Sequence, residues 1–247
     1  GTGSEATKNA VISRSGKNGF KKSLRHDNYV PDIAIVDPYL TISCPGNITA
    51  ASGMDCFTQL VESYLSDKSC EYTDALAWEG LRAIKSSLWQ SYLNGTDIQA
   101  RSDMSFAALT SGICLANAGL GAVHGFASSL GGMFEIPHGV VCGTLMAVAN
   151  EVNVKELRSS KSKNPALKKY SALGTLFLAA DRKSDDYFID GFIEYLKELT
   201  LKLKLPRLSE YGILAGDIQS IIENTEIKNN PVVLGHEELE SILYSRL

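Results

Sequence analysis

The chain has 247 residues, of which 44% are hydrophobic and 21% are charged, an ordinary globular composition with room for one large or two small domains. Its formal net charge is −4, and because no basic stripe interrupts the mixed charges, a nucleic-acid partner is not expected. The longest apolar run, around residues 139–150, is too short to cross a bilayer, so a membrane protein is not expected either.

Residues 1–45 have β-like or irregular character. The run KNAVIS over residues 8–13 precedes a glycine-containing turn over residues 14–22, which favours a β-hairpin. Residues 31–38 (PDIAIVDP) form an apolar run between two prolines, which predicts a short buried strand. The opening GTGSEA matches a dinucleotide-binding GxGxxA pattern, but that pattern needs a strand before it and a helix after it, so we do not interpret it as a Rossmann loop.

Helical periodicity begins after this region. The first predicted helix covers residues 47–66, with Asn47 as its N-cap and Gly53 as a break. The second covers residues 73–95, begins with a Thr73 cap and stops at Asn94 and Gly95. Further helices are predicted over residues 103–120, 139–153, 164–179, 186–204 and 235–247. The pattern therefore predicts a mainly α protein, with a small β-containing entry followed by an all-helical domain.

A polar line runs along the first predicted helix. Asp55, Gln59 and Glu62 stand at positions i, i+4 and i+7, which places them on one helical face. The residues between them are largely apolar, so the helix is expected to be buried. A carboxylate in a core needs a cation, a metal ion or several hydrogen-bond donors.

The glycine-rich segment over residues 119–139 contains two of the four histidines, His124 and His138. A buried histidine needs a partner for each ring nitrogen. One aspartate oxygen and two imidazole nitrogens suit Zn²⁺ or Fe²⁺ and leave positions open for water or substrate. By spacing alone, the alternative is two hydrogen-bonded histidines and an aspartate that stabilises its helix.

Five stretches, in the same order, resemble the iron-containing (group III) alcohol dehydrogenases: GTGSEAT, PDIAIVDPYLT, GMDCFTQLVESYLS, GLGAVHGFASSLGGMFEIPHG and NNPVVLGHEELESIL. The resemblance covers almost the whole chain. It implies the dehydroquinate synthase-like fold, in which an N-terminal α/β domain binds NAD or NADP and a C-terminal helical domain holds a catalytic divalent metal. Residues 1–45 are then expected to be a remnant of the cofactor domain, and residues 46–247 the helical metal and substrate domain.

The resemblance also implies a ligand set. Members of the family bind the metal through an aspartate, a histidine one helical turn later, and two further histidines. In this chain these positions are Asp55, Gln59, His124 and His138, so Gln59 departs from the usual histidine. A second departure is Ser128, where many relatives carry a histidine near the nicotinamide, because a hydroxyl cannot serve as an imidazole acid or base near neutral pH.

Three outcomes stay open at Gln59. Its amide oxygen coordinates the ion, although it matches Fe²⁺ or Zn²⁺ less well than imidazole does. Alternatively, the site works with three protein ligands, or the site has degenerated. We expect a retained but weaker metal site. Thr2, in the GTGSE stretch, is interpreted either as a cofactor contact or as a plain turn residue.

Other polar residues receive structural interpretations. Glu62 is expected to be a surface or interhelical acid rather than a group that orients a metal ligand. Cys142 and Met133, near the histidine pair, are assigned to the core. His26 and His236 are interpreted as a loop residue and a helix-start residue. The five cysteines form no Cys-x-x-Cys pair, which indicates a reducing compartment and leads us to expect a cytoplasmic protein.

The implied function is hydride transfer between a small alcohol or aldehyde substrate and NAD or NADP, with Fe²⁺ or Zn²⁺ as the metal. The chain alone is expected to lack this activity because most of the cofactor site is missing from it, and a homodimer is expected. Two other classes stay open: an Asp-His-His hydrolase or lyase, and a non-catalytic helical module with a degenerated metal site.

Overall fold

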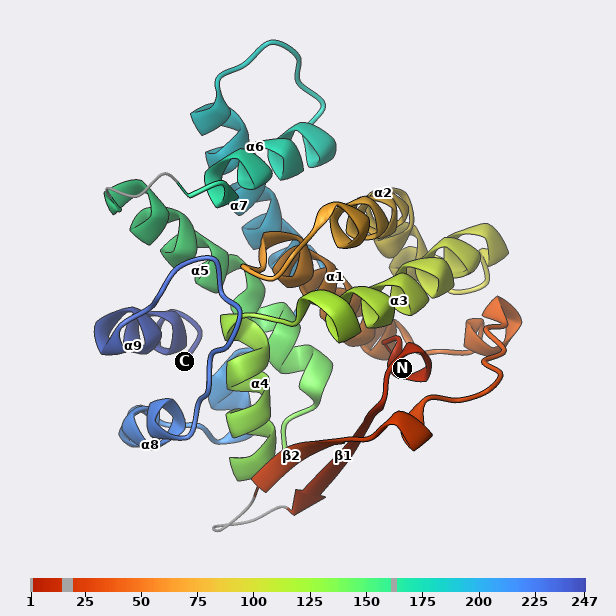
Figure 1. The fold of residues 1–247 in the computed structure, drawn as a ribbon, viewed down its shortest axis with the longest axis horizontal. Helices are drawn as coiled ribbons and strands as arrows, with labels where there is room; N and C mark the ends of the chain where they lie inside the picture. Colours follow the sequence, from red (N-terminus) through yellow and green to blue (C-terminus); the bar gives the residue numbers. More distant parts are fainter. Residues whose placement is uncertain (1, 15–19, 161–163) are drawn as a thin grey trace.

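A computed structural model describes residues 2–14, 20–160 and 164–247 of the chain. The α-helices in these ranges are α1 (Gly46–Leu65), α2 (Glu71–Leu93), α3 (Ile98–Ala118), α4 (Ala122–Met133), α5 (His138–Ser159), α6 (Ala166–Phe177), α7 (Asp185–Lys202), α8 (Ile218–Glu223) and α9 (His236–Tyr244). The strands of the described residues, β1 (Asn9–Arg14) and β2 (Phe20–Arg25), pair antiparallel. The predicted mainly α fold with a small β-containing portion is therefore confirmed (Figure 1).

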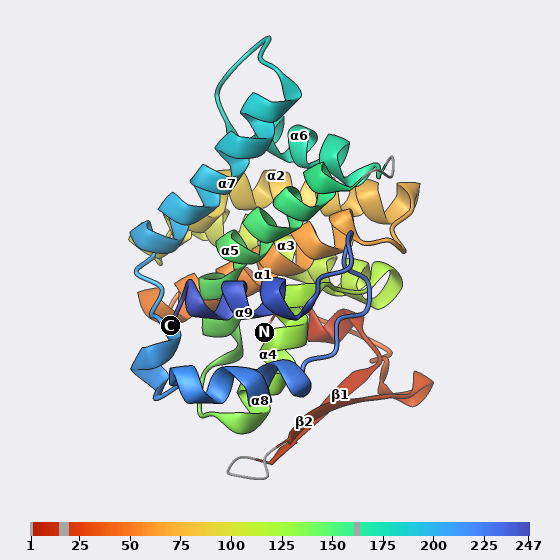
Figure 2. The same ribbon diagram turned by 90° about the vertical axis from the view of Figure 1, so that its left-hand side faces the viewer.

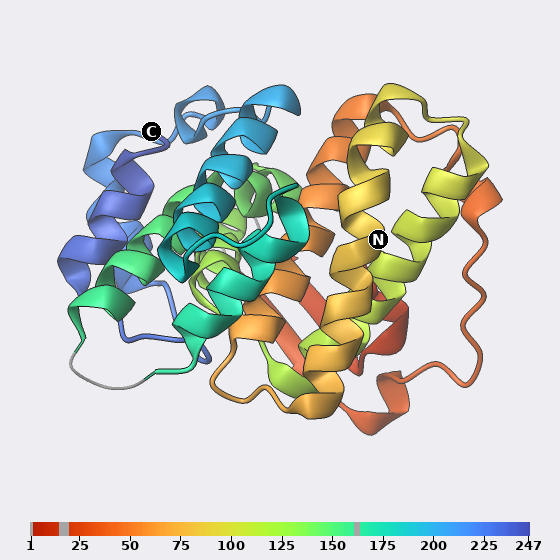
Figure 3. The ribbon, with the colours of Figure 1, turned by 90° about the horizontal axis from the view of Figure 1, so that it is seen from above.

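The helices form two adjoining groups. Viewed from above, the early helices α1 to α3 lie on one side and the later helices lie on the other (Figure 3). Two apolar cores hold them together, one including Phe57 and Phe192 and the other including Phe126 and Leu145. Helix α5 contributes residues to both cores. Its stability and orientation therefore come from burial in these cores more than from local helix propensity.

The β-hairpin lies beside α4 (Figure 2). At Gly132 of α4 a Cβ would lie 3.0 Å from the backbone nitrogen of Lys21, so a side chain there would crowd the strand. The predicted hairpin is confirmed for its strands, whereas its turn residues 15–19 lie outside the described residues. The hairpin therefore covers one end of α4 and brings its lysines close to that helix.

The buried strand predicted over residues 31–38 is wrong. This segment is extended but unpaired, and Ile33 and Ile35 are 80% and 86% exposed. Pro31 and Pro38 lack the N–H that a sheet ladder needs, and no strand of the described residues runs beside the segment. An apolar run bounded by prolines fits an extended surface segment equally well.

The first two helices differ in detail from the prediction. Helix α1 continues through Gly53 without a break. A Cβ at this position would overlap the side chain of Leu88 on α2, so glycine allows the two helices to pack closely. Its N-cap is Pro45 rather than Asn47. Glycine here serves close packing between helices, not helix termination.

Helix α2 begins two residues before its predicted cap. Glu71 is its first residue, and the hydroxyl of Thr73 accepts a hydrogen bond of 2.9 Å from the N–H of Cys70. Thr73 therefore still satisfies the start of the helix, but from the third position. The predicted end is confirmed, because Asn94 is the C-cap.

Helices α4 and α8 were not predicted from the sequence. Four of the glycines in the segment over residues 119–139 lie inside or at the start of α4, and glycine is unfavourable in helix interiors. At Gly125 a Cβ would lie 2.9 Å from the carbonyl oxygen of Glu226. Tertiary packing against the later chain therefore outweighs the low helix propensity of this segment.

No single helix of the described residues is long and apolar enough to cross a membrane, while α3 and α4 taken together pass a test of length and composition with a bend of 99° between them.

Asn230, in the segment between α8 and α9, connects α4 to α5. The Asn230 Oδ1 atom accepts a hydrogen bond of 3.2 Å from the N–H of Ala122, at the start of α4. The Asn230 amide nitrogen donates to Asn153 Oδ1 on α5 over 2.7 Å and to the carbonyl oxygen of Val232 over 2.8 Å. One side chain thus joins the beginning of α4 to the middle of α5.

Candidate metal centre

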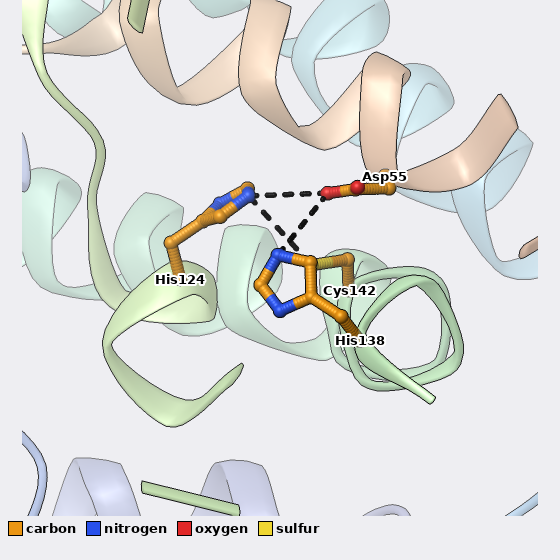
Figure 4. Close-up of side chains that lie close together, drawn as sticks. All are labelled: Asp55, His124, His138 and Cys142. Atoms are coloured by element: carbon orange, nitrogen blue, oxygen red, sulfur yellow. Dashed lines mark hydrogen bonds and ion pairs between the residues drawn. The ribbon is translucent and has the colours of Figure 1, made fainter. Parts of the chain in front are cut away.

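Asp55, His124 and His138 converge from three helices (Figure 4). The Nε2 atom of His124 lies 3.2 Å from Asp55 Oδ1, and the Nε2 atom of His138 lies 3.6 Å from the same oxygen. Asp55 is buried within α1, whereas the His138 side chain is 33% exposed. The structure therefore brings together the carboxylate and the two imidazoles that the sequence singled out.

Both histidines lie in the first turn of a helix. His124 is the third residue of α4, and His138 is the first residue of α5, directly after the Pro137 N-cap. Proline fixes the backbone φ angle before the helix and sacrifices no helical hydrogen bond there. Both rings consequently project from the first turns of helices whose packing fixes their positions.

Glu62 orients His124. Its Oε2 atom lies 2.7 Å from His124 Nδ1, and its Oε1 atom accepts a hydrogen bond of 2.7 Å from the N–H of Val123. With Nδ1 donating to the carboxylate of Glu62, Nε2 faces Asp55, and it offers a lone pair to a cation once it has lost its proton. Glu62 is 7% exposed and joins α1 to α4, so of the two expected positions it has the interhelical one, and the expectation that it does not orient His124 is wrong.

The structure turns Gln59 with its nitrogen toward Asp55. Gln59 Oε1 accepts a hydrogen bond of 2.9 Å from the hydroxyl of Ser111. Its Nε2 atom donates to Thr2 Oγ1 over 3.2 Å and to Asp55 Oδ1 over 3.5 Å. An amide nitrogen offers donors and no lone pair to a cation, so in this orientation Gln59 supports Asp55 by hydrogen bonding.

Thr2 lies against the same carboxylate. Its hydroxyl donates a hydrogen bond of 2.6 Å to Asp55 Oδ2, while Oδ1 faces the two imidazoles. The proton of the Thr2 hydroxyl is therefore donated within the protein, and this contact holds the N-terminal segment to α1. A role for Thr2 in cofactor binding stays a prediction.

Cys142 lies in the centre, although the sequence assigned it to the core. Its sulfur is 3.7 Å from His124 Nε2 and 3.8 Å from His138 Nε2, and the residue is fully buried. Cys142 stands one turn after His138 on α5 (Figure 4). The spacing His-x-x-x-Cys was the available signal, because residues at i and i+4 share a helical face.

The electrostatics of the cluster favour an ionised Asp55 and a protonated His124. Burial alone would raise the pKa of Asp55, but the hydrogen bond from His124 and the charge of the imidazoles outweigh it and lower the pKa below its usual range. Burial opposes protonation of His124, yet Cys142, Asp55 and Glu62 together raise its pKa well above the ordinary value. Burial lowers the pKa of His138 to about 4, so this ring is neutral near pH 7.

Burial also governs the thiol. Removal from water raises the pKa of Cys142 to about 12, against the opposing influence of His124. In the absence of a cation the thiol is therefore neutral at physiological pH. A bound divalent ion reverses this balance, because a coordinating thiol loses its proton.

A cleft of about 850 Å³ opens beside the two histidines, between the hairpin and α4. Lys21 lies at its inner end, with its Nζ atom 3.3 Å from His138 Nδ1. The cleft has a basic lining: Lys8, Lys21, Lys22, Arg25, Lys68 and Lys228. Ser128 also lines it, and its hydroxyl donates to the carbonyl oxygen of His124 over 3.1 Å.

The donor set fits a divalent transition-metal ion. A tetrahedral zinc site with metal–nitrogen and metal–oxygen bonds of about 2.0–2.1 Å separates neighbouring ligand atoms by about 3.4 Å. The two nitrogen–oxygen separations here, 3.2 and 3.6 Å, lie on either side of this value. Nitrogen and carboxylate oxygen are also the ligand types that Zn²⁺ and Fe²⁺ accept.

The helical fold, with a buried carboxylate and two imidazoles that face one point beside an open cleft, defines a helical protein with a candidate metal site. The profile of the Fe-containing alcohol dehydrogenase family, C-terminal, matches residues 49–247. The chain belongs to this family, and the resemblance found in the sequence is confirmed.

Individual relatives agree with this assignment. Alcohol dehydrogenase 4 of Saccharomyces cerevisiae is 32% identical over 248 residues, which cover 98% of this chain and 62% of the relative. The 1,3-propanediol dehydrogenase of Klebsiella pneumoniae is 32% identical over 226 residues, which cover 88% of this chain and 57% of the relative. A crystal structure of a 1,3-propanediol oxidoreductase superposes with a TM-score of 0.89 at 29% identity, covering 100% of this chain and 64% of the other. This chain thus spans about three fifths of the length of these relatives.

Proposed function

We propose that this chain supplies the metal-binding and substrate-binding half of an NAD- or NADP-dependent alcohol dehydrogenase that acts on small alcohols and aldehydes. The observation that carries the proposal is the convergence of Asp55, His124 and His138 beside the cleft. Membership of the Fe-containing alcohol dehydrogenase family supports the reaction class, and names such as 1-propanol dehydrogenase and 1,3-propanediol dehydrogenase among the relatives support the substrate class.

The residues of this chain would hold the ion and orient its ligands. Asp55, His124 and His138 would bind Fe²⁺ or Zn²⁺, with Glu62 fixing the His124 ring and Thr2 fixing the Asp55 carboxylate. An ion bound there would act as a Lewis acid toward the substrate oxygen, and a nicotinamide would exchange the hydride. We place the substrate and the nicotinamide in the basic cleft beside the two histidines.

The site offers no imidazole at residue 128 for proton transfer. Ser128 keeps its hydroxyl on the His124 carbonyl and lies at the surface of the cleft. A hydroxyl does not exchange protons near neutral pH as an imidazole does. We therefore infer that the substrate proton is exchanged with water in the open cleft.

Metal loading tests the proposal. Purified residues 1–247 are dialysed against Zn²⁺ or Fe²⁺ under nitrogen, and bound metal is measured by mass spectrometry. We expect one ion per chain in the wild type and none in Asp55→Ala. Absence of bound ion in the wild type would contradict the proposal and favour a non-catalytic helical module.

Turnover assays separate the remaining classes. With propan-1-ol and NAD⁺ or NADP⁺, we expect no reduced nicotinamide from the metal-loaded chain alone, because its described residues contain a two-stranded sheet rather than a dinucleotide-binding sheet. Rapid nicotinamide reduction would contradict this expectation. Metal-dependent ester hydrolysis without nicotinamide would instead favour the hydrolase or lyase class.

The setting of the protein is also proposed. Free cysteines at all five positions suit a reducing compartment such as the cytoplasm. A homodimer is the assembly we expect from the family resemblance. Sedimentation at micromolar concentration measures the assembly, and a monomer at all concentrations would contradict it.

A further inference from the structure

The sulfur of Cys142 occupies the position of a fourth metal ligand. A tetrahedral ion with a metal–sulfur bond of about 2.3 Å places sulfur about 3.6 Å from each neighbouring nitrogen ligand. Cys142 Sγ lies 3.7 Å from His124 Nε2 and 3.8 Å from His138 Nε2. These two atoms, the sulfur and an Asp55 oxygen all lie within 4.8 Å of one another, and Figure 4 shows the four side chains facing a common point.

The surroundings of Cys142 are unlike those of another buried cysteine. Cys114 on α3 is also fully buried, but its sulfur contacts the carbonyl oxygen of Thr73 within the helical core. The Cys142 sulfur contacts two imidazole nitrogens, so two potential ligands approach a thiol that has a single proton to share. Cys142 therefore lies beside two nitrogen atoms that can act as metal ligands, whereas Cys114 contacts a backbone oxygen.

Gln59 does not provide the fourth ligand of the ion in this structure. Gln59 Oε1, its one atom with lone pairs for a cation, is engaged by Ser111, and its nitrogen faces Asp55. The fourth ligand therefore does not come from α1. Helix α5 provides it instead, one turn after His138, on the face that already carries a ligand.

We propose that the Cys142 thiolate is the fourth protein ligand of the divalent ion and makes the site selective for zinc. This inference rests on the proposed function, which supplies the metal site, and the substrate oxygen would then be a fifth ligand of the ion. On binding, the S–H bond breaks, its proton passes to solvent, and a sulfur–metal bond forms without oxidation or reduction. Thiolate favours Zn²⁺ over harder ions such as Mn²⁺, which prefer carboxylate and water.

Cobalt(II) provides the direct test. Metal-free residues 1–247 are titrated with Co²⁺ under nitrogen, and the absorption spectrum is recorded to one equivalent. We expect an intense near-ultraviolet thiolate-to-cobalt charge-transfer band in the wild type. The band should be lost in Cys142→Ser and retained in the matched buried control Cys114→Ser.

Metal selectivity provides a second test. The ratio of Zn²⁺ affinity to Mn²⁺ affinity is measured by competition with a chromophoric chelator. Loss of the sulfur in Cys142→Ser should lower this ratio at least about tenfold, because Zn²⁺ gains more from thiolate than Mn²⁺ does. The ratio should be unchanged in Cys114→Ser.

The outcomes distinguish this inference from the proposed function. A wild type that binds one Co²⁺ without a charge-transfer band would overturn the role of Cys142 and leave the Asp-His-His site intact. An unchanged zinc-to-manganese ratio in Cys142→Ser would do the same. A wild type that binds no Co²⁺ would overturn both. Because the wild-type spectrum is itself decisive, the test does not depend on the folding of Cys142→Ser.

Discussion

Two groups of buried polar side chains lie along α5 and are satisfied differently. In the middle of the helix, the hydroxyl of Tyr170 donates to Asn150 Oδ1 over 2.7 Å, and Asn150 Nδ2 donates to the carbonyl oxygen of Met146 over 2.7 Å. Each donor there meets an acceptor. At the start of the helix, His138 and Cys142 instead face Asp55 and His124.

The difference separates a structural network from a binding site. A closed network of donors and acceptors stabilises the core and has no capacity left for a ligand. At the start of α5, by contrast, a cation can replace the proton of His124 and take the lone pairs of the two imidazoles and of Asp55. The two groups should therefore respond in opposite ways to substitution, and the following changes test this contrast.

The largest effect is expected for Asp55→Asn. The substitution removes the carboxylate that both imidazoles face, so Zn²⁺ affinity should fall by more than the ~10–100-fold that loss of a ligand-orienting group costs. Equilibrium dialysis measures it. The exposed Asp190→Asn, which loses only a contact with Arg158, should bind Zn²⁺ as the wild type does. Equal affinities in Asp55→Asn and the wild type would remove the distinction between the two groups.

Glu62→Gln is expected to have the next largest effect. Its amide nitrogen would face His124 Nδ1 and favour the tautomer whose Nε2 carries the proton, so Zn²⁺ affinity should fall about 10–100-fold with the fold intact. The matched control is Glu151→Gln, at an exposed position that contacts Lys197. A weakened site in the control, or full affinity in Glu62→Gln, would argue against the orienting role.

Tyr170→Phe tests the structural network. Loss of the hydroxyl leaves Asn150 Oδ1 buried without its donor, which should lower the free energy of unfolding by about 1–3 kcal/mol. Urea unfolding measures this loss, and Zn²⁺ binding should stay at the wild-type level. A variant with unchanged stability but weaker Zn²⁺ binding would reverse the roles assigned to the two groups.

Metal affinity should strengthen with pH by about tenfold per unit for each proton displaced. The pKa of His124 is raised by Cys142, Asp55 and Glu62 against the effect of burial, so this ring holds a proton that the ion must displace. Below that pKa, protons compete with the metal, and the competition weakens as pH rises. Calorimetric titrations in buffers of different ionisation enthalpy count the released protons, and a count of zero would contradict the expectation.

Lys21→Met gives the smallest expected effect, and in the opposite direction. The ammonium group donates toward His138 Nδ1, which disfavours a proton there and repels a nearby cation. Its removal should tighten Zn²⁺ binding about fivefold, or about 1 kcal/mol, which is the interaction between two charges about 4 Å apart in water. Lys22→Met, in the same hairpin and cleft, is the control for general charge. An equal gain in both variants would assign the effect to the cleft as a whole.

The sequence predicted the principal residues of the site because their types are rare in a core. By spacing alone, Asp55, His124 and His138 also fitted two hydrogen-bonded histidines and a helix-stabilising aspartate, and it was the family resemblance that implied the ligand set. The contact of Glu62 with His124 could not be predicted, because it joins helices distant in sequence. For Cys142 the His-x-x-x-Cys spacing was a signal, whereas its approach to His124 on another helix was not.

The errors in the fold have a related origin. The glycines of α4 lower its local propensity, while the packing that compensates comes from the hairpin and from Glu226. The apolar run over residues 31–38 has the composition of a core strand but lies exposed. Local pattern cannot distinguish these cases, since burial is decided by elements far along the chain.

The Asn230 side chain has a consequence for how the centre is assembled. His124 and His138 belong to α4 and α5, and Asn230 ties the start of α4 to Asn153 of α5. The relative position of the two imidazoles thus depends in part on a segment more than ninety residues later in the chain. During synthesis, a nascent polypeptide that ends before this asparagine already carries Asp55, His124 and His138, but it lacks the side chain that links α4 to α5.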